Sequence, residues 1–216
     1  MTKNFLITRP THDEKVSYLY EFSKDIIIVS KERKDIHVTV LEGSNANRVN
    51  VEASLNKEKP RLVFLNGHGD KKTVLGHDNE SILDSENVSL TKNKIIYALA
   101  CDSLEELGPI AVENGAIAYI GYKARFMFVT DPSRSSTPSK DKNALPFKRA
   151  CTALIGSLLN GLTIERSIEI TKQEYIHSIR SYGTSKDNFG AAPLIRFALT
   201  WDYVFLDSEG DPNAAF

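Results

Sequence analysis

Apolar runs of strand length recur along the chain, each closed by glycine or polar residues. The runs over 5–7, 62–65, 95–100 and 116–122 are apolar almost throughout, as in strands that are buried on both faces of a parallel sheet. The segment 35–41 instead alternates apolar and polar positions, which predicts a strand nearer the edge of a sheet. The chain therefore contains at least five predicted strands, most of them central in the sheet.

Segments whose apolar residues have helical spacing lie between these runs. Apolar residues recur at mixed three-and-four spacing over 13–30, which predicts a helix that leads into a second apolar segment. The stripe over 147–158 predicts another helix, ended by Gly161 and followed by a further helix. Ser103 begins the pattern S-x-x-E, a capping box, which predicts a helix that starts there and stops at Gly115.

Strands that alternate with helices predict an α/β fold, a three-layer sandwich with a mostly parallel central sheet flanked by helices. We expect a single domain over 1–216, because no interior linker divides the chain. The segment 130–143 has no apolar residue and is predicted to be an exposed polar loop. In such a sheet, sites form at the carboxyl ends of the strands, so the loops at His68 and Cys101 are expected to meet at one edge.

Composition narrows the class of protein. Among 216 residues, 27 are Lys or Arg and 28 are Asp or Glu, giving a net charge of −1. Without a dense basic stripe, nucleic acid is not expected as a partner. The apolar runs are too short for a membrane span, and no secretory signal is visible. Two cysteines are too few for a disulfide framework, which favours a reducing, cytoplasmic compartment.

The strongest chemical candidates are His68, bracketed by Gly67 and Gly69, and Cys101. A thiol needs a base or a positive field to become a nucleophile, and the predicted helix after Cys101 would supply such a field at its N-terminus. Taken singly, Cys101 could be a small core residue and His68 a loop residue that caps a backbone group. Together, at the ends of two apolar strands, they favour a catalytic pair.

The order and context of these residues resemble a known superfamily. LVFLNGHG over 62–69, followed by IIYALACD over 95–102, is similar to the histidine-then-cysteine signature of the caspase-like cysteine peptidases, which include caspases, gingipains, clostripain, separase and CHAT-domain proteases. In that superfamily His-Gly follows the third strand and Ala-Cys the fourth. LDSEGDP over 206–212 is similar to the Gly-Asp-Pro ending of gingipain-type and CHAT domains. The resemblance covers about residues 5 to 212.

The resemblance implies a mechanism. Cys101 would be the nucleophile that forms a thioester acyl-enzyme, and His68 the general acid/base that protonates the leaving amine. The backbone N–H groups of Gly69 and Cys101 would form the oxyanion hole. No third catalytic residue, cofactor or metal is implied. The expected partners are a protein or peptide substrate and a regulatory protein.

This chain also departs from the caspases proper. Leu99 and Ser103 replace the glutamine and glycine of the caspase motif Q-A-C-x-G, and His68 and Cys101 are only 33 residues apart. The nearer resemblance is to the gingipain and CHAT branch, so cleavage after a basic residue is favoured over cleavage after aspartate. The residues expected to bind substrate, from loops at the same sheet edge, are Asp70, Arg9, Gly121 and Tyr122.

Other functions fit the pattern less well. A class I amidotransferase would place its cysteine in a G-x-C-x-G turn with the histidine later, and a dinucleotide site would need a third glycine. A catalytically silent caspase-like module that acts in protein interaction or regulation stays open. The remaining histidines show no metal-ligand spacing with one another or with the cysteines, so no structural zinc is expected. They are His12, His37, His77 and His177.

Overall fold

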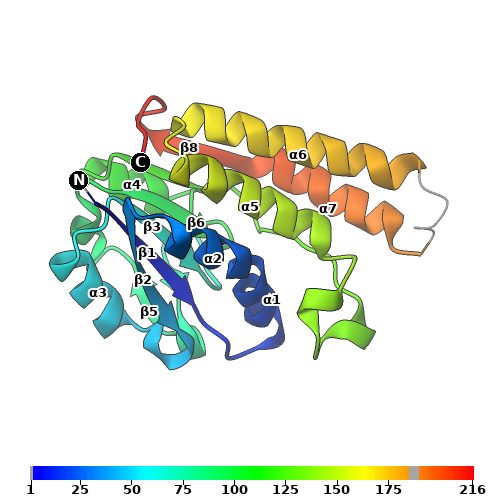
Figure 1. Ribbon diagram of the computed structural model, residues 1–216, viewed down its shortest axis with the longest axis horizontal. Coiled ribbons are helices and arrows are strands. Elements are labelled where there is room, and N and C mark those ends of the chain that lie inside the picture. The colour runs from blue at the N-terminus through cyan, green and yellow to red at the C-terminus, as the bar shows by residue number, and fades with distance from the viewer. Residues whose placement is uncertain (1, 185–189) are drawn as a thin grey trace.

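A computed structural model describes residues 2–184 and 190–216, and its centre is a six-stranded sheet (Figure 1). The strand order is β2-β1-β3-β6-β7-β8, with all pairs parallel except the last, which is antiparallel. The predicted α/β fold with a mostly parallel sheet flanked by helices is confirmed. The strands are β1 (Lys3–Arg9), β2 (Ile36–Glu42), β3 (Leu62–Asn66), β6 (Ile95–Leu99), β7 (Ala118–Tyr122) and β8 (Leu206–Gly210).

Helices cover both faces of the sheet because successive residues of each central strand point to opposite sides. On one face, Phe64 and Tyr97 stack at 4.7 Å between ring centroids and join the larger apolar core. On the other face, Val63 and Ile96 belong to a second core. The first core is closed by α1 (Glu14–Phe22), α2 (Lys24–Glu32), α5 (Leu145–Leu159), α6 (Ile164–Thr184) and α7 (Ala192–Phe205), and the second by α3 (Arg48–Lys57) and α4 (Leu107–Glu113).

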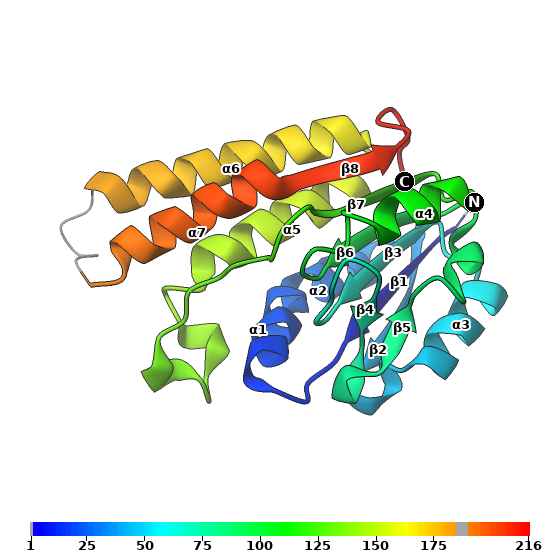
Figure 2. The same cartoon turned by 180° about the vertical axis from the view of Figure 1, so that it is seen from behind.

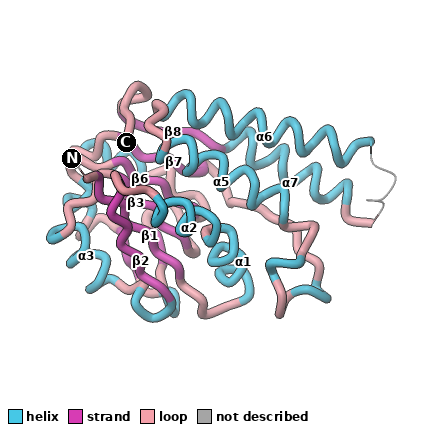
Figure 3. Tube along the Cα trace, viewed as in Figure 1, coloured by secondary structure: helices cyan, strands magenta, loops and turns pink. Residues whose placement is uncertain are grey.

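The views from front and back show how these layers lie. Helices α6 and α7 run beside α5 and extend past the end of the sheet (Figures 1 and 2). The short hairpin β4 (Val74–Leu75) and β5 (Ser81–Leu83) lies on the side of α3. The trace coloured by secondary structure shows long loops between these elements (Figure 3). Short 3-10 turns occur at Gly43–Asn45, His77–Asn79, Val88–Thr91, Pro132–Arg134 and Pro138–Lys140.

Most predicted elements are found close to their expected ranges. The strand predicted over 35–41 is β2, at one edge of the sheet, and the stripe over 147–158 lies within α5. Gly161 follows the end of α5 with a φ of +79°, a conformation that favours glycine. No helix within the described residues is long and apolar enough to cross a membrane.

The capping-box prediction at Ser103 is wrong, because α4 begins at Leu107. Residues 101–106 form turns, and two of their N–H groups bond to a distant part of the chain instead of opening a helix. Asp102 N–H donates to the carbonyl of Ala124, and Leu104 N–H donates to that of Tyr122. Asp102 also has a φ of +57°, which is incompatible with a helix beginning there. These tertiary bonds override the local signal.

The polar segment 130–143 is only partly the exposed loop that its composition predicts. Most of its side chains are exposed or half-buried, but Asp141 is 4% exposed. The Asp141 carboxylate accepts hydrogen bonds from the Tyr18 hydroxyl and the Asp131 N–H, both at 2.7 Å, and from the Asn143 N–H at 2.8 Å. One buried carboxylate therefore ties the segment to α1.

Candidate functional site

The loops that follow β3 and β6 meet at the carboxyl edge of the sheet and line a cavity of about 610 Å³. His68 comes from the first loop and Cys101 from the second, so the two predicted catalytic residues share this cavity. The first two turns of α1 and the segment 125–128 after β7, with Thr130, complete its walls. The cavity thus draws on four separate stretches of the chain.

The glycines beside His68 are required by close packing. A Cβ on Gly67 would lie 1.8 Å from the carbonyl oxygen of Leu75, in the hairpin. A Cβ on Gly69 would lie 2.9 Å from the Cβ of Ala100 and 3.2 Å from the carbonyl oxygen of Cys101. The histidine loop is therefore pressed between the hairpin and the cysteine loop. This contact fixes the two loops relative to each other.

Asp13 contacts the candidate catalytic histidine and was not singled out by the sequence. Its Oδ2 lies 2.6 Å from Nε2 of His68, while its Oδ1 accepts the N–H of Val16 at 2.8 Å and caps α1. Burial acts to raise the pKa of Asp13, but the Val16 N–H and the His68 ring outweigh it, so this pKa lies below its ordinary value. A carboxylate is thus held against the imidazole by a helix cap.

The thiol of Cys101 is half-buried and bonds to the carbonyl of Phe126, with Sγ 3.9 Å from the oxygen. Burial raises the pKa of this thiol, and Asp102 adds to the effect while Arg125 opposes it. The expected thiolate-stabilising helix terminus is absent from this position because α4 starts six residues later. Burial therefore favours the protonated thiol over the thiolate at Cys101.

Two backbone donors beside the thiol are unused by the fold. Gly69 forms an isolated antiparallel bridge with Val74, and the hydrogen bonds that close it belong to the neighbouring residues Asp70 and Leu75. Within the described part of the chain, the N–H groups of Gly69 and Cys101 donate no hydrogen bond. Both residues line the cavity. These two N–H groups are therefore available to a ligand.

Charged side chains of both signs line the cavity. Asp70, which was predicted to bind substrate, is one of them, and its Oδ1 accepts the N–H groups of Lys72 and Thr73. The Asp70 carboxylate is thereby oriented by its own turn. The other charged lining residues are Glu14, Lys15, Asp102 and Arg125.

The other three residues predicted to bind substrate lie outside the cavity. Arg9 is 4% exposed, pairs with Glu42 and lies over the ring of Tyr20. Tyr122 is buried in the core, with its hydroxyl 2.9 Å from that of Tyr175. Gly121 is enclosed within β7. Arg9 and Tyr122 are the last residues of β1 and β7, but their side chains are buried, and none of the three residues lines this cavity.

Helix α7 fastens the cavity wall formed by residues 125–128. The Met127 N–H donates to Oδ1 of Asp202 at 2.9 Å, and the Trp201 indole donates to the carbonyl of Arg125 at 2.9 Å. Asp202 is fully buried, and burial raises its pKa well above the ordinary value. The wall that accepts the Cys101 thiol is therefore set by a helix near the C-terminus.

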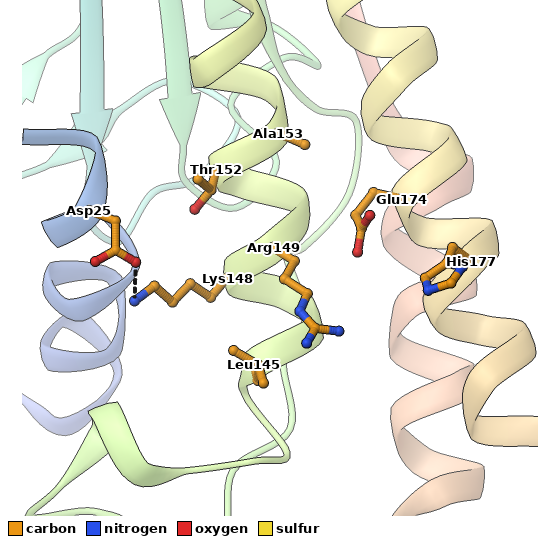
Figure 4. Close-up of a pocket in the computed structure, with 8 residues that line it drawn as sticks. All are labelled: Asp25, Leu145, Lys148, Arg149, Thr152, Ala153, Glu174 and His177. Carbon is orange, nitrogen blue, oxygen red and sulfur yellow. Dashed lines mark ion pairs between the residues drawn. The ribbon is translucent and has the colours of Figure 1, made fainter. Parts of the chain in front are cut away.

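Two further features could bind ligands. His12, Asp13 and His68 each offer one metal-ligand atom, and these atoms all lie within 4.8 Å of one another. A second cavity of about 570 Å³ lies between α2, α5 and α6 (Figure 4). The only ion pair drawn there joins Lys148 to Asp25 at 2.7 Å, and Arg149, Glu174 and His177 also line it.

Comparison with known proteins gives little beyond this geometry. The chain matches no family model and no curated protein. Among solved structures it is similar to a secreted C11 cysteine protease from Bacteroides thetaiotaomicron, iotapain, with a TM-score of 0.44 and 12% identity. The match covers 58% of this chain and 53% of that one, so this chain matches about half of that protein's length. At this level the likeness carries no argument about activity.

Proposed function

We propose that this protein is a caspase-like cysteine peptidase that uses Cys101 and His68 as a catalytic dyad. The observation that carries the proposal is the shared cavity, in which a thiol, an imidazole and two unused N–H groups meet at adjacent strand ends. These are the groups that acyl transfer requires: a nucleophile, an acid/base and donors for an oxyanion. The sequence resemblance points to the same chemistry.

The residues can be assigned to steps. His68 takes the proton of the Cys101 thiol as the sulfur attacks the scissile carbonyl carbon. The carbonyl oxygen becomes an oxyanion that accepts the N–H groups of Gly69 and Cys101. As the C–N bond breaks, His68 returns the proton to the leaving amine, which leaves a thioester. Water, deprotonated by His68, then hydrolyses the thioester and regenerates the thiol.

Asp13 acts in this scheme as a positioning residue. Because Nε2 of His68 is bonded to Asp13, Nδ1 is the nitrogen left to exchange a proton with the reacting groups. A carboxylate on one ring nitrogen also stabilises the imidazolium that forms when the thiol is deprotonated. The dyad predicted from the sequence therefore works with a third residue.

The raised pKa of Cys101 supports deprotonation during the reaction rather than a preformed ion pair. Burial keeps the thiol neutral at rest, so His68 must act as a general base when substrate is bound. The same property favours a peptidase with low reactivity in the absence of substrate. A catalytically silent module would also have a neutral thiol, so a measurement of peptidase activity must decide between the two functions.

The charges in the cavity support a basic side chain next to the scissile bond. Glu14, Asp70 and Asp102 outnumber Lys15 and Arg125 along its lining. Asp70 is the strongest candidate contact, since its turn already orients the carboxylate. Substrates would accordingly be peptides or proteins cleaved after arginine or lysine.

The proposal is tested with reduced protein and fluorogenic peptides that end in Arg, Lys, Asp, Asn or Leu. We expect cleavage after Arg or Lys, with Cys101→Ala and His68→Ala each reducing kcat/KM by about a thousandfold or more. Cys151→Ala and His37→Ala are matched controls outside the cavity, and both should retain activity. Asp70→Asn should lose the basic preference while cleaving other peptides.

The result that would overturn the proposal is clear. If the folded wild-type protein cleaves no peptide of the panel, or if Cys101→Ala cleaves as fast as wild type, the dyad is not a peptidase site. The catalytically silent module would then be the better account. Circular dichroism of each variant ensures that a lost activity is not a lost fold.

A further inference from the structure

Three of the five histidines gather at one corner of the molecule beside the catalytic dyad. The ring centroid of His12 lies 5.9 Å from that of His68 and 5.3 Å from that of His77. They come from three different loops, those after β1, after β3 and between β4 and β5. Asp13 lies within this group, in contact with both His12 and His68.

We propose that His12, Asp13 and His68 form a binding site for a divalent transition metal of the zinc class, and that the metal switches the enzyme off. The regulatory part of this inference rests on the proposed peptidase function, whereas the binding part does not. The metal would bind one ring nitrogen of each histidine and one carboxylate oxygen of Asp13. It would thereby occupy the general base.

The spacing of the ligand atoms is close to what such a metal needs. Oδ2 of Asp13 lies 2.6 Å from Nε2 of His68 and 3.6 Å from Nε2 of His12. Tetrahedral ligands at about 2.0–2.1 Å from zinc lie roughly 3.3 Å from one another, between these two values. All three ligand atoms already lie within 4.8 Å of one another, so side-chain rotation alone can close the site.

The types of ligand atom also match those of a zinc site. Two imidazoles and a carboxylate leave a fourth position open to water, as in zinc sites with three protein ligands. Imidazole nitrogen favours zinc, copper or nickel over the hard cations magnesium and calcium. Oδ1 of Asn79 lies 3.2 Å from Nε2 of His12, which places a further oxygen next to the group.

His12 is a buried histidine whose ring is only partly used by the hydrogen bonds of the fold. Its side chain is only 7% exposed, its Nε2 lies 3.2 Å from Oδ1 of Asn79, and its Nδ1 is a buried atom without a partner among the described residues. Buried polar atoms nearly always have partners, so few bonds hold this ring in place. The metal would bind Nε2, the ring atom that lies 3.6 Å from Oδ2 of Asp13, in place of its contact with Asn79.

Metal binding would remove His68 from catalysis in a defined way. When the metal binds Nε2, the single proton of the neutral His68 ring, which Nε2 shares with Asp13, moves through solvent to Nδ1 of the same ring. With Nδ1 protonated and Nε2 bound to the metal, the ring cannot accept the proton of the Cys101 thiol. Without that step the thiol stays protonated, because burial already raises its pKa.

Binding is tested first, without any substrate. We expect the reduced protein of 216 residues to bind one Zn²⁺ by calorimetry and Co²⁺ with a tetrahedral visible spectrum. His12→Gln should weaken Zn²⁺ binding by about tenfold or more, since even residues that only support the ligands of a metal site contribute about 10–100-fold to metal affinity. His77→Gln is the matched control, because His77 packs against His12 but lies outside the ligand group. It should bind as wild type does.

The thiol is tested separately. If Cys101→Ser abolishes the Co²⁺ spectrum while His12→Gln leaves it unchanged, the metal binds through sulfur and the proposed site is wrong. Equal Zn²⁺ affinity in wild type and His12→Gln would overturn the proposal as well. A failure of peptidase activity alone would not, because binding is measured without turnover.

Regulation is tested with the peptide that the wild type cleaves best. Zn²⁺ should inhibit wild type and His77→Gln over the concentration range in which it binds. His12→Gln should cleave normally without metal and require about tenfold or more Zn²⁺ for the same inhibition. If His12→Gln is inhibited like wild type, the metal acts elsewhere and the switch is not at this site.

Discussion

The two cysteines of this protein have the same side chain and different surroundings. Cys101 is half-buried at a strand end, with Arg125 and Asp102 nearby and two unused N–H groups beside it. Cys151 is 1% exposed within α5, beneath the same sheet. Burial raises the pKa of both thiols, most strongly that of Cys151. Burial thus favours the protonated form of both thiols.

The difference teaches that a low pKa is not what distinguishes the candidate nucleophile here. Cys101 is reached from a cavity that also contains a histidine, whereas Cys151 is enclosed by apolar residues and Tyr97. Access and a partnered base separate the two. Four measurements can break or sharpen this comparison.

The largest expected contrast is in alkylation by iodoacetamide. In the folded protein, Cys101 should react about a thousandfold or more faster than Cys151, because a core residue is exposed only by global opening, which costs about 5–15 kcal/mol. Mass spectrometry of the two cysteine peptides over time measures both rates. In guanidinium the two rates should converge, and similar rates in the native state would contradict the comparison.

The next effect concerns Gly69→Ala, which acts on the backbone beside Cys101. The added methyl would lie 2.9 Å from both the Ala100 Cβ and the Thr73 carbonyl, so the histidine and cysteine loops must separate. We expect kcat/KM to fall about a hundredfold through loss of oxyanion donors. Gly156→Ala is the control, because no atom lies within 4 Å of its added Cβ in the helix of Cys151. Equal activity in both variants would refute the oxyanion role.

The third effect is smaller and concerns stability, where the substitution of Cys151 should cost more than the substitution of Cys101. Cys151→Ala should lower the free energy of unfolding by about 1–2 kcal/mol, because it leaves a small cavity in the core. Cys101→Ala, at the mouth of a cavity, should cost less than half as much. Urea unfolding followed by circular dichroism measures both. A larger loss for Cys101→Ala would mean that its thiol is structural.

The smallest effect is electrostatic. Asp102 helps to raise the pKa of Cys101, so Asp102→Asn should lower that pKa, increase the thiolate fraction at neutral pH and speed alkylation severalfold. Asparagine also tolerates the positive φ of this position. Arg125→Gln should have the opposite effects, a higher pKa of Cys101 and slower alkylation. In wild type the rate should keep rising with pH beyond the ordinary thiol pKa of about 8.5.

Much of the fold follows from local patterns. The apolar runs that form β3 and β6 are apolar almost throughout and contain no glycine or proline. Both faces of these strands are therefore buried. Their order along the chain then places His68 and Cys101 at one edge, since parallel strands share the direction of their carboxyl ends. The shared position of His68 and Cys101 could be predicted because it needs only the strands and the polarity of the sheet.

Other parts of the site depend on contacts that no local pattern encodes. Asp13 meets His68 across 55 residues of chain, and its only sequence signal is that of an ordinary helix cap. The S-x-x-E motif at Ser103 misled because the N–H groups of Asp102 and Leu104 bond to Ala124 and to Tyr122, the last residue of β7. Arg9 and Tyr122, predicted as substrate contacts, are buried outside the cavity, because charge and ring type do not reveal which side chains the core encloses.

The buried carboxylate of Asp141 has a consequence for the integrity of the chain. Asp141 lies after Arg134 and Lys140, yet its hydrogen bonds reach back to Asp131 and to Tyr18 in α1. A single peptide-bond cut at either basic residue would therefore sever the covalent chain between partners that remain fastened across the break. The two fragments would stay associated, and the helix that borders the cavity would keep its place.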